Sequence, residues 1–239
     1  MAILAKNVLE NASIVLQDED NVRWTLPELR RWFNDALREI SAIKPTAFSA
    51  SIIISLVVGT RQTIPAAYPT LLKITRNLKT TAESPRVGAR AIRTVDMRIM
   101  DVSFIDWHDT SINAVSKYVS NVTFDPKEVG VFWVYPPNDG TGIVEATVSS
   151  IPTGIPVPAS DPNLISSYDV TIGAPDIYAN AIVDYILYRA FSKDSQYAGS
   201  VQKAAAYYQQ FANILGVMVT NDVMRGPNAM PSTEQENAA

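Results

Sequence analysis

Two stretches near the start of the chain carry apolar residues at helical spacing. The first, residues 5–16, stops at an acidic cluster. The second, residues 25–44, is more regular, and its apolar positions are Leu29, Trp32, Phe33, Ala36, Leu37, Ile40 and Ile43. Thr25 and Glu28 have the spacing of a capping box, and Pro45 ends the element because the residue before a proline avoids helical geometry. We therefore predict two helices at the start of the chain.

The middle of the chain changes to β-branched and alternating apolar residues. Its predicted strands are 49–58, 61–64, 71–77 and 114–122, its predicted short helix is 95–102, and a turn is expected at Gly59-Thr60. The clearest pattern is two apolar runs, 131–135 and 143–148, separated by the proline- and glycine-containing segment 136–142. Such a pattern predicts a β-hairpin with a long loop.

Alternation along the first of these runs places its residues on two faces. Val131, Trp133 and Tyr135 share one face, and Phe132 and Val134 share the other. Both faces are apolar, so both need a covering layer from the chain itself or from a neighbouring copy. This pattern favours a packed scaffold or an assembly subunit.

The last third begins with residues 151–173, whose four prolines indicate an extended tether over the surface. Helical periodicity returns at Ala174, with Pro175 in the first turn, and a short reversal after residue 191 predicts a helical hairpin that ends at Gly216. The remaining residues alternate apolar anchors with glycine and proline. They are predicted to form a tail or a docking arm.

These elements predict an α+β fold. About four helices from both chain ends form one layer, and a small antiparallel β-rich unit is inserted between its halves. The predicted boundaries are 1–45 for the N-terminal helices, 46–150 for the β-rich unit, 151–173 for the tether, 174–216 for the helical hairpin and 217–239 for the C-terminal arm.

The amino-acid composition limits the kinds of metal and catalytic site that the chain can form. The 239 residues are 47% hydrophobic and only 18% charged, which is compatible with extensive protein–protein contact or with a well-packed monomer. There is no cysteine, and His108 is the single histidine, so thiolate sites and multi-histidine metal centres lack their ligands. No apolar run is long enough to span a bilayer, and no signal peptide is recognisable, so we expect folding in a cytoplasm.

Two groups of carboxylates are candidates for catalysis or metal binding. Four aspartates beside His108 match no ordered calcium loop, and we interpret them as solvated; they are Asp96, Asp101, Asp106 and Asp109. Asp184 is expected to be partly buried and paired with Arg189 or a tyrosine hydroxyl. No phosphate-binding or nucleophile motif is present, so we predict neither catalytic residues, cofactor nor metal.

Charge is distributed unevenly. Residues 61–98 hold eight basic and two acidic side chains, whereas the whole chain has a net charge of −4. This polarity favours docking between unlike surfaces. It is also compatible with a DNA-binding accessory protein that uses the same basic segment. Docking is favoured because aromatic residues suited to base stacking are not interleaved with these bases.

An ordered series of short motifs resembles a known family. The motifs are Trp32-Phe33-Asn34-Asp35-Ala36-Leu37-Arg38-Glu39-Ile40, Gly59-Thr60-Arg61-Gln62, Arg76-Asn77, Val95-Asp96-Met97 with Met100-Asp101, Trp107-His108, Tyr118-Val119, Val134-Tyr135-Pro136-Pro137 and Tyr188-Arg189-Ala190-Phe191-Ser192-Lys193-Asp194. From Thr25 to Gly216 the chain is similar to head-to-tail adaptors of tailed bacteriophages, such as the tail tubular protein A of short-tailed phages.

The resemblance implies a virion protein of the neck or tail, and a homo-oligomeric ring, typically a dodecamer, without catalytic residues. Such a ring lies beneath the portal protein and continues the channel for genomic DNA toward the tail nozzle protein. In the family the helical layer commonly meets the portal and the β part faces the tail. No membrane is involved.

The motifs do not assign contact residues, so docking residues are proposed from the basic segment, from the two-faced apolar run, and from the apolar anchors of the C-terminal arm, which is expected to contact the portal. They are Arg86, Arg90, Arg93, Tyr135, Met218, Met224 and Met230. A third hypothesis is a carbohydrate-binding or hydrolytic tail module built around Trp133 and Tyr135.

Overall fold

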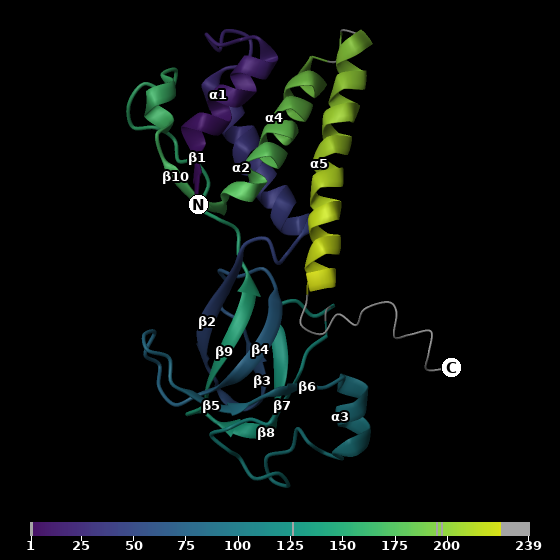
Figure 1. Ribbon diagram of the computed structural model, residues 1–239. Coiled ribbons are helices and arrows are strands. Elements are labelled where there is room, and N and C mark those ends of the chain that lie inside the picture. The colour runs from purple at the N-terminus through teal and green to yellow at the C-terminus, as the bar shows by residue number, and fades with distance from the viewer. Residues whose placement is uncertain (1, 126, 195, 197, 226–239) are drawn as a thin grey trace, which may run out of the picture. The chain divides into compact units, whose positions relative to one another are not determined.

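The computed structural model describes residues 2–125, 127–194, 196 and 198–225. The chain divides into two compact units. Unit 1 combines residues 1–44 and 152–239, and unit 2 comprises residues 45–151. Both ends of the chain thus build unit 1, and the middle of the chain builds unit 2 (Figure 1). The combination of helices with antiparallel sheets confirms the α+β fold class.

Unit 1 is formed mainly by helices α1 (Ala5–Leu16), α2 (Leu26–Ile43), α4 (Ala179–Lys193) and α5 (Ala198–Arg225). Helix α4 packs against the other three. Strand β1 (Ala2–Leu4) pairs with β10 (Thr171–Pro175), and two short 3-10 helices, η1 (Ile165–Tyr168) and η2 (Asp176–Tyr178), flank β10. The core of unit 1 therefore lies around α4.

The amphipathic pattern of α2 explains its position. Most of the apolar residues predicted to face inward are buried, among them Leu29, Phe33 and Ile40, whereas Ile43 in the last turn is 41% exposed. Burying each such side chain stabilises the fold by about 1.5–3 kcal/mol. The capping box forms only in part, because the Thr25 hydroxyl bonds the Glu28 carboxylate at 3.5 Å and caps no backbone N–H.

Unit 2 consists of two four-stranded sheets and one short helix, α3 (Met97–Ser103). One sheet has the order β2 (Ser49–Ser55), β9 (Ile143–Ser149), β4 (Leu71–Leu78) and β5 (Gly88–Ala91). The other has the order β3 (Val58–Thr63), β8 (Val131–Asp139), β7 (Asn121–Thr123) and β6 (Arg93–Thr94). Side chains from both sheets, including Ile74, Phe132 and Val144, share one buried core.

The predicted hairpin of 131–135 with 143–148 is wrong. Strand β8 pairs with β3 and β7, whereas β9 pairs with β2 and β4, so the two runs belong to different sheets. The segment between them crosses from one sheet to the other. The buried Asn138 side chain supports this crossing by accepting hydrogen bonds from the N–H groups of Gly140 and Gly142. Phe132 and Val134 face the core, and the other face of β8 is half-buried.

Several element boundaries also differ from the prediction. Gly59 and Thr60 lie within β3, and only the end of the run 114–122 enters a strand, β7. Pro175 closes β10, and helix α4 begins at Ala179, four residues later. The stretch 151–173 is not wholly extended, because it contains the 3-10 helix η1, and its last residues join β10, which pairs with β1.

The last helix does not end at Gly216. Helix α5 continues to Arg225, so the first nine residues of the predicted arm are helical. Asp222 on this extension pairs with the buried Lys44 at 2.8 Å. This ion pair explains why the helix continues past a glycine, whose cost within a helix is only about 1 kcal/mol. The rest of the predicted arm, 226–239, lies outside the described residues.

Candidate functional site

The basic segment of unit 2 contains a structural ion-pair network. Glu145 on β9 accepts from Arg76 on β4 at 2.9 Å and from Arg86 at 2.9 Å, and its side chain is only 14% exposed. Arg86 also bonds Glu83 and both the hydroxyl and the carbonyl of Ser51. The Arg86 guanidinium therefore fastens the loop before β5 to the sheet, which limits its availability as a docking residue.

The Arg86 hydrogen bond and the two guanidinium charges hold the pKa of Glu145 below its usual range. Because its folded pKa is depressed, Glu145 stabilises the protein above the unfolded pKa of about 4.5, and the contribution disappears as pH falls through the folded value.

We expect Glu145→Gln to lower the free energy of unfolding by about 1–2 kcal/mol at pH 7. Denaturant unfolding at several pH values measures this cost, which should vanish in acid. Glu83→Gln, at a 70% exposed side chain, is the matched control and should change stability little.

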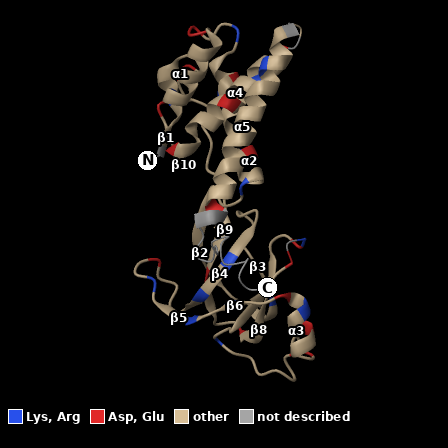
Figure 2. Cartoon of the chain, turned by 45° about the vertical axis from the view of Figure 1, so that its right-hand side comes forward, with Lys and Arg blue, Asp and Glu red and all other residues tan. Residues whose placement is uncertain are grey.

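Arg90 and Arg93 are placed differently from Arg86. Both are exposed, and no described acidic side chain pairs with either. They line a cavity of about 310 Å³ together with Ala91, Ser120 and Asn121. This notch lies where the chain passes from β5, at the edge of one sheet, to β6, at the edge of the other (Figure 2). Of the arginines proposed for docking, these two are therefore the available pair.

The aspartates near His108 hold local structure. The Asp96 side chain caps α3 by accepting from the Arg98 N–H, Asp101 accepts from the indole of buried Trp107, and Asp109 accepts from Ser111. Within the part of the chain that the structure describes, no group of three metal-ligating side chains is arranged to hold an ion. His108 bonds the Thr60 hydroxyl at 2.9 Å through Nδ1 and lies against the Trp107 ring.

Tyr135 and Trp133 lie on the half-buried face of β8. The Tyr135 ring packs against Phe104 with their centroids 4.6 Å apart. Phe104 directly follows α3, so the Tyr135 ring packs against the C-terminal end of that helix. Sequence reasoning had missed this contact because Phe104 shows no periodic pattern.

The proposed methionines belong to the last part of the chain. Met218 is half-buried on α5. Met224 is in the last turn of α5, but its side chain is not described, and Met230 lies outside the described residues. Their role in docking stays a prediction.

Asp184 on α4 is half-buried, and neither Arg189 nor a tyrosine hydroxyl bonds it among the described residues, so the expected pairing is wrong there. Burial alone raises its pKa. A raised folded pKa means that stability is fully present below the unfolded value of about 3.8 and is lost as pH rises through the folded value. Asp184→Asn should therefore stabilise the protein at pH 7 by on the order of 1 kcal/mol. Thermal unfolding at pH 7 and at pH 3 tests the sign; a destabilised variant at pH 7 would contradict it.

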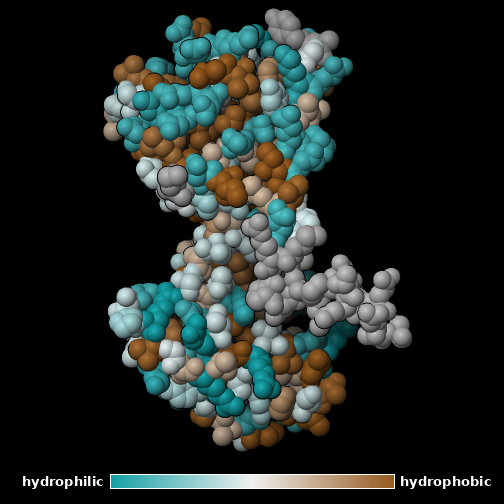
Figure 3. Space-filling view, in the orientation of Figure 1, coloured by the Kyte–Doolittle hydropathy of each residue, from teal (hydrophilic) through white to brown (hydrophobic). Residues whose placement is uncertain are grey.

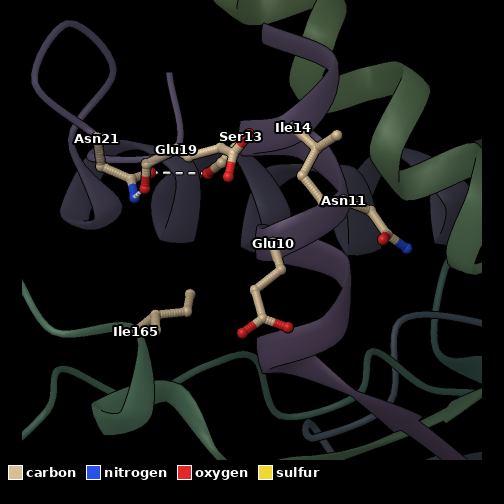
Figure 4. A pocket seen from close by; sticks show the side chains of 7 residues that line it. All are labelled: Glu10, Asn11, Ser13, Ile14, Glu19, Asn21 and Ile165. Carbon is tan, nitrogen blue, oxygen red and sulfur yellow. Dashed lines mark hydrogen bonds between the residues drawn. The ribbon is translucent and has the colours of Figure 1, made fainter. Parts of the chain in front are cut away.

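Unit 1 contains a largely polar cavity beside α1. The cavity in Figure 4, about 330 Å³, lies between α1, the following turn and η1. Its Ser13 hydroxyl donates to Asn21 at 2.7 Å, and Glu10 forms an ion pair with Lys6. Among the described helices, none has the length and apolar character needed to cross a membrane.

The sequence matches the family model described as SU10 adaptor protein over residues 5–231. The chain therefore belongs to this family of phage head-to-tail adaptors, and its role is structural. No curated protein matches the sequence significantly.

Proposed function

We propose that the protein is the subunit of an adaptor ring that joins the portal to the tail and continues the channel for genomic DNA. The observation that carries the proposal is the family match across nearly the whole chain. The ring is proposed to be dodecameric, to lie in the virion neck, and to act without catalysis. Unit 1 is proposed to meet the portal protein and unit 2 the tail nozzle protein.

Two features of the structure support this proposal. The uneven charge of unit 2 suits a head-to-tail contact, in which the two flanks of each subunit differ and complement each other. Large apolar side chains also remain exposed in the described part of unit 2, among them Val58, Val102 and Ile105 at 69%, 83% and 80%. Exposed apolar groups of this size are typical of subunits that are buried in an assembly.

Light scattering of the purified chain with and without the portal protein of the same phage tests the proposal. We expect a particle many times the 26.2 kDa mass of the chain when portal is present. Failure to bind portal would contradict it. Salt-dependent binding to duplex DNA that is lost in Arg90→Ala/Arg93→Ala would favour a DNA-binding accessory protein instead.

The end of the chain is proposed to contact the portal. Because Asp222 holds Lys44, a truncation should start after Arg225 and not after Gly216. We expect removal of residues 226–239 to leave the thermal unfolding of the protein unchanged and to weaken portal binding in a pull-down assay. Normal binding by the truncated chain would rule out this role for the arm.

A further inference from the structure

The notch between β5, β6 and β7 is built on a fixed backbone. We call its lining residues the arginine notch; they are Arg90, Ala91, Arg93, Ser120 and Asn121. The fully buried Asn77 side chain donates to the carbonyls of Arg90 and Val119, at 2.8 Å each, and accepts from the Val119 N–H at 3.0 Å. The Arg93 N–H donates to the Ser120 carbonyl at 2.9 Å. Both walls of the notch are therefore tied together by the fold, so a ligand meets groups that are already in place.

The polar side chains of the arginine notch are hydrogen-bond donors without acceptors. Arg90 and Arg93 are exposed, and neither forms an ion pair with a described residue. Within the described chain the Ser120 hydroxyl makes no hydrogen bond, and the Asn121 amide makes only a long contact, 4.0 Å, with the sulfur of Met100. No acidic side chain is among the described lining residues. This set of donors is typical of a site for an oxyanion, either a carboxylate or a phosphate.

Helix α3 borders the arginine notch, because Asn121 contacts Met100 on the buried side of that helix. The outer side of α3 has no cover within the described chain, where Ile99 and Val102 are 57% and 83% exposed. Figure 3 shows hydrophobic side chains gathered at this end of unit 2. Arginine is enriched in protein–protein interfaces, whose centres are apolar. A protein partner can therefore use the notch and the apolar side of α3 together.

Negative charge on α3 disfavours a nucleic acid in the arginine notch. Asp96 caps the helix three residues after Arg93, and Asp101 follows Met100; both aspartates are exposed. Duplex DNA carries one charge per about 1.7 Å of its axis, so phosphates on either side of a bound one would approach these aspartates. One Asp or Glu side chain brings a single charge and avoids this repulsion. The favoured ligand is therefore a carboxylate of a protein.

We propose that the arginine notch binds an acidic side chain of the tail nozzle protein, and that Ile99 and Val102 contact apolar residues beside that side chain. The inference rests on the proposed function, because it names what unit 2 recognises in its partner. The two guanidinium groups and the Ser120 hydroxyl donate to the carboxylate oxygens. Charge-assisted hydrogen bonds of this kind are about twice as strong as neutral ones. The notch thus sets the register of the contact, and the apolar side chains add buried area.

Charge reversal tests this docking. Chains assembled on portal protein are captured on a sensor surface, and nozzle protein of the same phage is added. We expect Arg90→Glu/Arg93→Glu to raise the dissociation constant for nozzle protein at least about tenfold. Lys73→Glu/Lys79→Glu makes the same charge change at exposed residues outside the notch and should raise it less than about threefold. Circular dichroism verifies that the variants fold, and equal losses in both would overturn the proposal.

A cross-link identifies the group that occupies the notch. Arg93→Lys keeps the positive charge and supplies an amine, which a carbodiimide joins to a carboxylate in contact with it. Mass spectrometry should find an amide bond between residue 93 and an Asp or Glu of nozzle protein. Lys73 and Lys79 are native amines outside the notch, so they are internal controls and should form far less of this product. A bond from residue 93 to another copy of this chain, or none to nozzle protein, would contradict the assignment.

Three further outcomes distinguish the inference from the proposed function. If Arg90→Glu/Arg93→Glu binds nozzle protein normally but no longer retains duplex DNA, the notch binds phosphate and the inference is wrong. If the wild-type chain assembles on portal protein but binds nozzle protein no better than this variant does, the inference is wrong and the portal-binding role stands. If the wild-type chain does not assemble on portal protein, the proposed function itself fails.

Discussion

Replacing Asn138 with alanine should lower the free energy of unfolding of unit 2 by about 3 kcal/mol. The side chain is fully buried and makes four hydrogen bonds. Its amide donates to the carbonyls of Ser116 and Lys117 at 2.9 and 3.0 Å, and its oxygen accepts from Gly140 and Gly142 at 2.9 and 3.1 Å. Alanine leaves these buried backbone groups without partners, and each unsatisfied group costs about 1–3 kcal/mol.

Amide hydrogen exchange can show whether the loss of stability is confined to unit 2. Exchange in β8 and β9 should accelerate in Asn138→Ala, while exchange in α4 and α5 should not. Asn113→Ala is a suitable control, because the Asn113 amide also donates to two carbonyls, at 2.8 and 3.3 Å, but the residue is only half-buried. Equal losses of stability in the two variants would show that burial of Asn138 is unimportant.

Phe211→Ala should destabilise unit 1 by about 3–5 kcal/mol. Phe211 on α5 is fully buried, and its ring lies 5.2 Å from Tyr185 and 6.1 Å from Tyr208, measured between centroids. Its removal leaves a cavity between α4 and α5, the most extensively packed helix pair of the unit. Chemical denaturation measures the loss of stability, and amide hydrogen exchange should locate that loss in α4 and α5.

Tyr208→Ala provides the comparison for Phe211→Ala. Tyr208 contacts the same cluster, but it is 40% exposed, so its truncation removes less buried area and should cost clearly less. A loss of less than about 1 kcal/mol in Phe211→Ala would mean that the α4–α5 contact contributes little to unit 1.

The helices could be predicted because their apolar residues follow a local period. Leu29, Phe33 and Ile40 follow one another at intervals of four and seven residues, and all are fully buried. The α+β class and the helical bias of both chain ends followed from the same pattern. Gly216 misled the prediction, because the contact that extends α5 past it comes from Lys44, which is distant in sequence.

Strand pairing could not be predicted in the same way. The apolar run that forms β9 has its partners in β2 and β4, far earlier in the chain, and nothing local distinguishes that arrangement from a hairpin with β8. The candidate site shows the same limit. The excess of basic residues in 61–98 was visible, but Glu145 lies outside that segment, so its pairing with Arg86 was not.

An image of the virion neck tests the central claim most directly. Electron cryomicroscopy of intact particles should show copies of this chain in a closed ring at the junction of head and tail, with unit 1 and unit 2 fitting the density of each subunit. Particles that assemble fully without this chain at the junction would contradict the account.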